Sequence, residues 1–397
     1  MKILVYSLVD LQKSAHNSRL HQFLKYLSKN HEITVICIND CWKAKWDTKT
    51  DEYKKDFDFL YDNITIKYIT DRDMSPVFQD FFCTGNIKKI LQEIHFSEFD
   101  LFLNYNGLFT GYVISRIARA LGIPIIYDIA DDLPEMIATS PQIPSLLRAV
   151  GKTVGKIILH RSVSISDKVT ITTPVLQSAY QISPQKTELI PNGVDIRLFR
   201  KTDIPELIKE LKLKNSFTIG HVGVLREWLD FHPLFSAVRK LARSHDIKIL
   251  MIGGGVGYDD TVNLAKTYNI SDNIIFTGTI PYSRIPDYIG CMDVCVVPFK
   301  DDSVSQNSLP LKLFEYMSCE KPVISTKVHA IHELFKHDLV FVSGSQEYED
   351  AILRLYQDEM LRKELGSRGR TIIENNYQWD SLSGRLEKIM TGLSERS

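Results

Sequence analysis

Short apolar runs recur along the chain, separated by stretches in which apolar residues are spaced three and four positions apart. The runs are continuous rather than alternating, which is typical of parallel strands covered on both faces. In the stretches between the runs, as at 18–27 and 111–121, apolar residues spaced three and four positions apart predict helices. Strands are predicted at 3–6, 33–38, 101–103, 123–127 and 169–172, and in a second series at 217–222, 247–252, 274–276, 294–297 and 323–325.

This alternation of strand and helix occurs twice, so the sequence predicts an α/β fold of two Rossmann-like, doubly wound parallel-sheet domains with a cleft between them. The break falls in IPNGVDIRLFRKTDIP, where Pro191, Asn192 and Gly193 interrupt regular structure. We therefore predict an N-terminal domain at 1–193 and a C-terminal domain at 194–375. A final amphipathic helix at 376–397 is expected to pack back on the first domain.

Composition narrows the class of protein. The length of 397 residues suits two domains that each bury a core, and 44% hydrophobic residues with a net charge of −1 indicate a soluble globular protein without a nucleic-acid partner. The first run, MKILVYSLVD, is too short to span a membrane and is interpreted as a strand. The six cysteines are scattered along the chain. We interpret the neighbouring Cys291 and Cys295 as structural thiols rather than as zinc ligands. Reduced cysteines favour a cytosolic location.

The most informative segment is VVPFKDDSVSQNSLPLKLFEYMSCEKPVI, residues 296–324. It indicates a strand end, a polar loop, a helix and another strand. Ser308 is expected to cap the helix and Pro310 to occupy its first turn, leaving free amides that suit a phosphate. Glu315, about two turns further in, would bind a vicinal diol, and Lys312 adds a positive charge. Phosphate, diol and cation together describe a nucleotide sugar.

Two glycine-containing turns support an anion site. MIGGGVG, residues 251–257, follows a strand and precedes a helix, and the HVGVLRE turn brings Gly223 and Arg226 to a second strand end. Such turns also merely connect elements, and Arg226 is equally well explained as a solvated loop residue. Because loops at the carboxyl ends of parallel strands share one edge, Gly223, Arg226, Gly254 and the Ser308 turn are expected to face one cleft.

At this point the chain resembles the retaining family-4 glycosyltransferases, which have the twin-Rossmann GT-B architecture. The similar segments lie between about residues 164 and 333: SISDKVTITTPVLQSAY, LIPNGVDIRLF, ILMIGGGVGYDDTVNLA, NIIFTGTIPYSRIPDYIGCMDVCVVPF and LPLKLFEYMSCEKPVIST. The resemblance implies transfer of a sugar from a nucleotide sugar with retention at the anomeric carbon. It also implies that no metal ion or other cofactor is needed, because cationic side chains and helix amides stabilise the leaving diphosphate.

The resemblance also implies roles for individual residues. Glu315 would bind the ribose, Lys312 and Arg226 the diphosphate, and Asn307 the donor sugar. The family often has a glutamate at the position of Asn307 and an arginine at that of Val224. We assign no side-chain base. The catalytic candidates are Asn307, Lys312 and Arg226, and the donor-binding candidates are Gly223, Gly254, Thr279, Ser308, Leu309 and Glu315.

The acceptor-side candidates lie in the first domain. YDIADDLPE follows an apolar strand, and its carboxylates would face the acceptor; helix capping and a divalent ion are the alternatives. Ser14 and Ala15 stand where the family often has two glycines, and Ala130 stands where it often has histidine or arginine. The acceptor-side candidates are Ser14, Asp128, Asp131 and Asp132, with Glu135 nearby.

A basic amphipathic surface is also predicted in the first domain. No acidic residue occurs between Met136 and Ser166, or between Leu11 and His31. Such a surface would dock on an anionic membrane; the alternative is a solvated face above a core stripe. The basic residues are Arg148, Lys152, Lys156 and His160, then Lys13, Arg19, Lys25 and Lys29, and the interleaved apolar ones are Leu147, Val150, Val154, Ile157 and Ile158.

The resemblance thus implies a glycosyltransferase with a saccharide or lipid-linked acceptor, and the tendency of the family favours bacterial surface polysaccharide or glycolipid assembly. It would be cytoplasmic or lie at the inner face of the cell membrane. A nucleotide-sugar epimerase would share the fold but need no acceptor, and a non-catalytic partner subunit is suggested by Asn307. A dinucleotide oxidoreductase is disfavoured because the first strand lacks a glycine fingerprint.

Overall fold

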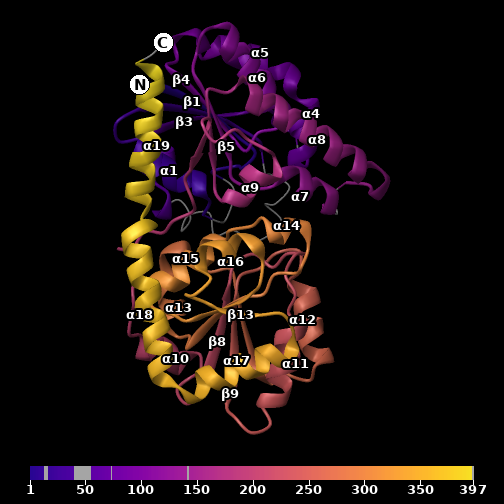
Figure 1. Ribbon diagram of the computed structural model, residues 1–397, viewed down its shortest axis with the longest axis vertical. Helices are drawn as coiled ribbons and strands as arrows, with labels where there is room; N and C mark the ends of the chain where they lie inside the picture. Colours follow the sequence, from indigo (N-terminus) through magenta and orange to yellow (C-terminus); the bar gives the residue numbers. More distant parts are fainter. Residues whose placement is uncertain (13–16, 40–54, 73, 141–142, 396–397) are drawn as a thin grey trace. The chain divides into compact units, whose positions relative to one another are not determined.

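A computed structural model describes residues 1–12, 17–39, 55–72, 74–140 and 143–395 (Figure 1). They form two compact units, Met1–Pro191 with Trp379–Ser397, and Asn192–Gln378. The units divide at 191/192 and 378/379, against predicted boundaries at 193/194 and 375/376. Among the described residues, no helix is both long and apolar enough to cross a membrane.

The first unit contains a parallel sheet with helices on it, in the order β3-β2-β1-β4-β5-β6-β7. Val5 pairs with Val35 on one side and Leu103 on the other, so the strand order reverses at β1 and β4. The strands are β1 Lys2–Ser7, β2 Glu32–Cys37, β3 Ile64–Tyr68, β4 Leu101–Tyr105, β5 Ile125–Ile129, β6 Lys168–Ile171 and β7 Thr187–Leu189. The helices are α1 Arg19–Leu27, α3 Phe59–Asp62, α4 Pro76–Phe82, α5 Ile87–Glu93, α6 Phe109–Ala120, α7 Leu133–Thr139, α8 Ser145–Ile165, α9 Pro174–Ala179 and α19 Trp379–Ser394.

The second unit repeats this plan with the order β10-β9-β8-β11-β12-β13, again parallel. Cys295 pairs with Gly220 and with Val323, so β8 and β11 mark the reversal of strand order. The strands are β8 Phe217–Val222, β9 Ile247–Ile252, β10 Ile274–Gly278, β11 Val294–Val297, β12 Val323–Thr326 and β13 Val340–Val342. The helices are α10 Pro205–Glu210, α11 His232–Leu241, α12 Tyr258–Thr267, α13 Ile285–Gly290, α14 Ser303–Gln306, α15 Leu311–Ser318, α16 His329–Phe335, α17 Ser345–Gln357 and α18 Glu359–Asn376.

The predicted fold class is confirmed, since each unit is a doubly wound parallel α/β sheet. In such a sheet, ligands bind at the carboxyl ends of the strands beside the point where the order reverses. In the second unit this point lies at the ends of β8 and β11. The loop that begins at Gly223 and the segment that leads into α15 are therefore where a ligand is expected.

The C-terminal helix α19 belongs to the first unit although the second unit precedes it in the sequence. Trp379 is buried, and its ring meets that of Phe23 on α1 edge-on at 5.5 Å. Arg385 donates to the carbonyl of Leu189, and His31 lies 2.8 Å from Glu387. Aromatic packing and polar contacts thus hold α19 on the unit that contains β1.

The core stripe expected as one alternative for α8 is present only in part: Ile158 is buried and Val154 packs against the same cluster, but the other apolar residues named for it are not buried. Leu147, Val150 and Ile157 are exposed, whereas Gly155 and Ser162 are buried. Small residues face inward because α7 approaches closely: an added Cβ at Gly151 would lie 2.9 Å from the Ile137 side chain. A face lined by glycine admits a neighbouring helix at short distance, and Leu147, Val150 and Ile157 lie away from that face.

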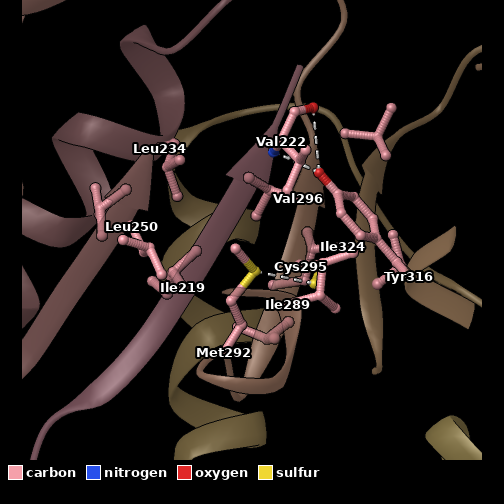
Figure 2. Close-up of a cluster of buried hydrophobic side chains, with 14 of the residues drawn as sticks. Ile219, Val222, Leu234, Leu250, Ile289, Met292, Cys295, Val296, Tyr316 and Ile324 are labelled. Atoms are coloured by element: carbon pink, nitrogen blue, oxygen red, sulfur yellow. Dashed lines mark hydrogen bonds between the residues drawn. The ribbon is translucent and has the colours of Figure 1, made fainter. Parts of the chain in front are cut away.

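The cysteines that the structure describes are buried and reduced: Cys37, Cys83, Cys291, Cys295 and Cys319; Cys41 lies outside the described residues. Cys295 donates to the thioether of Met292 within the core of the second unit, as Figure 2 shows. An added Cβ at Gly220 would overlap Met292, so this glycine makes room for the sulfur contact.

Candidate functional site

Three loops at the carboxyl ends of β8, β9 and β10 interlock through backbone hydrogen bonds. The amide of Gly223 donates to the Ile252 carbonyl at 2.9 Å, and that of Leu225 donates to the Gly254 carbonyl at 2.7 Å. The amide of Gly253 in turn donates to Gly278 at 2.8 Å. The two glycine-containing turns predicted to share one edge therefore do so, and together they form the glycine rim.

Gly223 sits where only glycine fits. Its φ is +125°, a conformation that side chains rarely adopt, and an added Cβ would lie 2.8 Å from Lys312 Nζ. The ammonium group of Lys312 therefore lies directly against the backbone of the turn after β8. A bare backbone beside a cation is the environment that a phosphate group needs.

This close approach gives a prediction. Gly223→Ala is expected to lower the free energy of unfolding by about 1–3 kcal/mol, because of the strained φ, and to weaken binding of nucleoside diphosphates by displacing Lys312. Thermal denaturation and calorimetric titration measure the two effects. Gly384→Ala is the control: it lies in α19 with open space around an added Cβ and should stabilise by about 0.5–1 kcal/mol. An alanine at 223 that leaves both quantities unchanged would contradict the prediction.

His221 contacts the end of the Lys312 side chain and positions it. Its Nδ1 lies 3.3 Å from the Val296 carbonyl, which can only accept, so the ring proton is on Nδ1. Nε2 is then free to accept from Lys312 Nζ at 3.3 Å. Burial and the neighbouring ammonium hold the pKa of His221 well below its usual range. A neutral imidazole thus positions the cation without competing with it for an anion.

Glu315 is buried one turn along α15 from Lys312. Tyr282 donates from its hydroxyl to Glu315 Oε1 at 3.2 Å, and its ring packs against Phe199 at 5.4 Å between centroids. Burial raises the pKa of Glu315 to about 7, while the Tyr282 bond and Lys312 oppose the rise. Burial likewise lowers the pKa of Lys312 to about 7. Both groups are thus poised to change charge when a polar ligand binds.

Tyr316 fixes α15 against the sheet (Figure 2). Its buried hydroxyl accepts from the amide of Val222 at 2.6 Å, at the point where β8 ends. The residue before Tyr316 is Glu315, so the same helix turn that is tied to β8 presents the carboxylate. This anchor sets the distance between the Gly223 turn and the polar residues of α15.

The predicted cap of this helix is wrong. α15 begins at Leu311 with Pro310 as its N-cap, in extended backbone. Ser308 instead donates from its hydroxyl to the Val304 carbonyl at 2.7 Å, because residues 303–306 form the separate short helix α14. Leu309 is buried and its carbonyl accepts from Asn192 at 2.6 Å. Since the cap side chain is proline, the first amides of α15 have no side-chain cap bond, as at an anion site.

The remaining donor-side candidates lie around this rim, and their roles stay predictions. Thr279 Oγ1 lies 3.4 Å from the position of an added Cβ at Gly254. The guanidinium of Arg226 stands over the ring of Trp228 at 5.5 Å from its centroid. Asn307 is the C-cap of α14 and is partly buried, just before the turn into α15.

On the first unit, Asp128 is part of a buried ion pair and is not an open carboxylate. Its two oxygens accept from Arg19 Nε at 3.1 Å and Nη2 at 3.2 Å, and Oδ1 also accepts from Thr170 at 2.5 Å. Arg19 donates further to the Pro191 carbonyl at 2.8 Å. The expectation that Arg19 contributes to a basic surface is therefore wrong, because its charge is buried and paired with Asp128.

The other acceptor-side candidates differ in exposure. Asp132 is buried, caps α7 by accepting from the Glu135 amide, and accepts from the Tyr180 hydroxyl. Asp131 is exposed, and its amide donates to Asn106 at 3.3 Å. Helix capping, one of the alternatives for this cluster, therefore applies to Asp132. In the part of the chain that the structure describes, no group of three or more potential metal ligands is present, and Ser14 lies outside it.

Comparison with known proteins matches residues 203–372 to the model of the family described as glycosyl transferases group 1. This region contains the Gly223 turn, Lys312 and Glu315. The second unit is a glycosyl transferases group 1 domain. The predicted resemblance to glycosyltransferases is thus confirmed for this domain at the level of group 1, and membership of family 4 stays a prediction.

Relatives of the group 1 domain include N-acetyl-alpha-D-glucosaminyl L-malate synthase of Bacillus anthracis, 24% identical over 240 residues. A putative teichuronic acid biosynthesis glycosyltransferase of Bacillus subtilis, TuaH, is 24% identical over 218 residues. These matches cover 58% and 53% of this chain, which spans only 61% and 52% of the relatives' lengths. HepE of Anabaena, solved with UDP and glucose, has the same fold, with a TM-score of 0.73, 18% identity, and coverage of 98% of this chain and 99% of HepE.

Three residues of the group 1 domain were not found from the sequence: His221, Tyr282 and Tyr316. Each acts on α15 from a distant part of the chain or through a buried contact. His221 is 91 positions from Lys312, so no local pattern links them. The one signal in the sequence concerned His221, which is an unusual polar residue near the end of the apolar run FTIGHV.

Proposed function

We propose that the chain is a glycosyltransferase that moves a sugar from a nucleotide-sugar donor to a saccharide or lipid-linked acceptor. The observation that carries the proposal is the arrangement on α15, where Lys312 lies against the Gly223 backbone and the buried Glu315 follows one turn later. A cation beside open amides suits a diphosphate, and a buried carboxylate suits a ribose diol. The group 1 domain and the names of its relatives support the same reaction class.

The chemistry proposed for this site is electrostatic. When the bond between the anomeric carbon and the diphosphate oxygen breaks, its electron pair stays on the diphosphate. Lys312, already positioned by His221, and the first amides of α15 would stabilise that charge without moving. We propose that this arrangement replaces a metal ion and that the sugar is transferred with retention, as the resemblance to family 4 implies. Asn307 and Arg226 would complete the donor contacts.

The proposed setting is the assembly of bacterial cell-surface polysaccharide or glycolipid. Supporting it, one relative is named as a putative teichuronic acid biosynthesis enzyme, and others are named as mannosyltransferases acting on phosphatidylinositol mannosides. We propose that the protein works on the cytoplasmic side, with the acceptor held by the first unit near Asp131.

Substitution of Glu315 tests the proposal. Glu315→Gln should weaken donor binding about ten- to hundredfold, because a charge-assisted bond to a ribose hydroxyl contributes roughly 1.5–3 kcal/mol. A panel of nucleoside diphosphates first identifies the base, and calorimetry then gives the dissociation constants. Glu333→Gln, on the exposed surface of α16, is the matched control and should bind as the wild type does.

A dideoxy analogue of the same nucleotide sharpens the experiment. It lacks the ribose hydroxyls, so it should bind the wild type and Glu315→Gln with similar affinity. If Glu315→Gln lost the same affinity for the normal nucleotide as for the dideoxy nucleotide, Glu315 would lie away from the ribose and the assignment would be overturned.

A second candidate function is a non-catalytic nucleotide-sugar-binding subunit. It is favoured by Asn307, which carries no charge at a position where the family often has a glutamate. Such a protein would bind the nucleotide sugar but release no nucleoside diphosphate in the presence of any acceptor. An epimerase would convert the donor sugar without an acceptor, so product analysis with and without acceptor separates the three.

A further inference from the structure

The outer face of α8 carries large apolar side chains that the fold leaves in water. Leu146, in its first turn, is 90% exposed, and Leu147, Val150 and Ile157 are also exposed. Their spacing of three, four and seven positions places them along one side of the helix. Water-exposed apolar residues are common singly, but a continuous stripe indicates a surface that is covered by something.

Aromatic residues of α4 extend this stripe. Phe82 is 70% exposed and stacks on Phe78, with 5.8 Å between ring centroids. Phe81 stacks on Phe109, the first residue of α6, at 4.9 Å. We define the α4–α8 surface by Phe78, Phe81, Phe82, Leu146, Leu147, Val150 and Ile157.

A shared core lies beneath both parts of the α4–α8 surface. Val77 of α4 and Val154 of α8 pack against one cluster that includes Ile137 and Ile158. Figure 1 shows α4, α6 and α8 on the same flank of the first unit. The exposed residues of α4 and α8 therefore project from one packed platform rather than from separate mobile segments.

The charges beside the α8 part of the α4–α8 surface are net positive. No acidic residue occurs between Met136 and Ser166, and His160 and Arg161 are exposed on α8. Lys152 and Lys156 both pair with the single carboxylate of Glu135, at 2.7 and 3.3 Å. One negative charge thus faces two positive ones, and the flank of the apolar stripe stays net positive.

We infer that the α4–α8 surface docks on an anionic lipid bilayer, with its apolar residues in the interface and its cations at the headgroups. An apolar stripe beside cations matches a bilayer, which offers hydrocarbon below a plane of negative charge. A second copy of this chain would bring the same net positive charge to the same surface and be repelled. The inference rests on the proposed function only in that docking would bring the protein to a lipid-linked acceptor.

Vesicle binding of the full chain tests the inference with a matched pair of variants. Leu146→Asp and Met360→Asp make the same kind of change at the second residue of a long helix, at side chains that are 90% and 73% exposed. Acidic residues are tolerated in a first helical turn, so both variants should fold. The probes are phosphatidylcholine vesicles with and without phosphatidylglycerol, in sedimentation assays at low and high salt.

The wild type should bind only the vesicles that contain phosphatidylglycerol, and binding should fall as salt rises. Leu146→Asp should weaken it by roughly tenfold or more, Phe82→Ser should weaken it as well, and Met360→Asp should leave it unchanged. Absence of binding, equal binding to both vesicle types, or equal loss in Leu146→Asp and Met360→Asp would overturn the inference. So would a wild-type dimer that Leu146→Asp dissociates.

Nucleoside diphosphate binding, measured on the same samples without vesicles, separates this inference from the proposed function. If vesicle binding behaves as expected while no nucleotide binds, the proposed function fails and the docking surface stands. If nucleotides bind and vesicles do not, the docking inference fails and the proposed function stands.

Discussion

Replacement of Lys312 by methionine is expected to lower the rate of sugar transfer by roughly 100- to 1,000-fold, the usual loss when one group that stabilises developing charge is removed. Methionine fills similar space beside Gly223 and His221 but has no charge to offer the leaving diphosphate. Steady-state kinetics with a saturating donor measures the effect. Lys336→Met, on the surface beside α16, should be without effect. A Lys312 variant that keeps wild-type turnover would remove this residue from the reaction.

The pH dependence of donor binding gives the same prediction a second readout. Burial lowers the pKa of Lys312 to about 7, so in the free protein its charge is present below that pH and lost above it. Burial raises the pKa of Glu315 to about 7, so its ionised, hydrogen-bond-accepting form is lost as the pH falls. Donor affinity should therefore peak near neutral pH. Lys312→Met should remove the alkaline limb of the profile, and Glu315→Gln the acidic limb.

Substitution of Asp128 by asparagine is expected to lower the free energy of unfolding by about 3–5 kcal/mol, because it leaves the buried charge of Arg19 without its partner. The amide group would also direct a donor towards the guanidinium of Arg19, which can only donate. Urea denaturation measures the loss. Nucleotide binding by the folded fraction should be retained, since Asp128 lies in the first unit.

Asp131→Asn provides the comparison for this substitution. Asp131 is three positions further along the same segment but exposed, so its loss should change stability by less than about 0.5 kcal/mol. If Asp128→Asn proved as stable as Asp131→Asn and only slowed transfer, Asp128 would belong to the acceptor site rather than to the support of the fold.

Strand prediction from sequence succeeded in the centre of each sheet and at the edge strand β10, and it missed the other three edge strands. The predicted limits of β8, β9 and β11 are those observed, because these strands are almost wholly buried and appear as continuous apolar runs. β3, β7 and β13 were missed, and each forms an edge. The residues of β3 alternate between buried or partly buried and exposed, and β7 and β13 are only three residues long. An edge strand needs little apolar sequence, so its pattern is weak.

The candidate site was predicted as far as local patterns reach. Lys312 and Glu315 on one helix, and the glycine turns at one sheet edge, follow from spacing and from parallel topology. The cap of α15 was predicted wrongly because serine before proline suggests a cap, and the intervening helix α14 left no separate signal. The pairing of Arg19 with Asp128 spans 109 positions and could only come from the fold.

The path of the chain through its two units has a consequence for synthesis. The second unit begins and ends at adjacent points: the Val194 amide donates to the Tyr377 carbonyl at 2.9 Å, and Val194 bridges to Gln378. It is thus an insertion within the sequence of the first unit, and α19 is synthesised after the whole of the second unit. The second unit can therefore fold before α19 is made, while the first unit must wait for α19, with the surface that receives Trp379 uncovered. Premature termination before residue 379 would therefore damage the unit made first and spare the one made second.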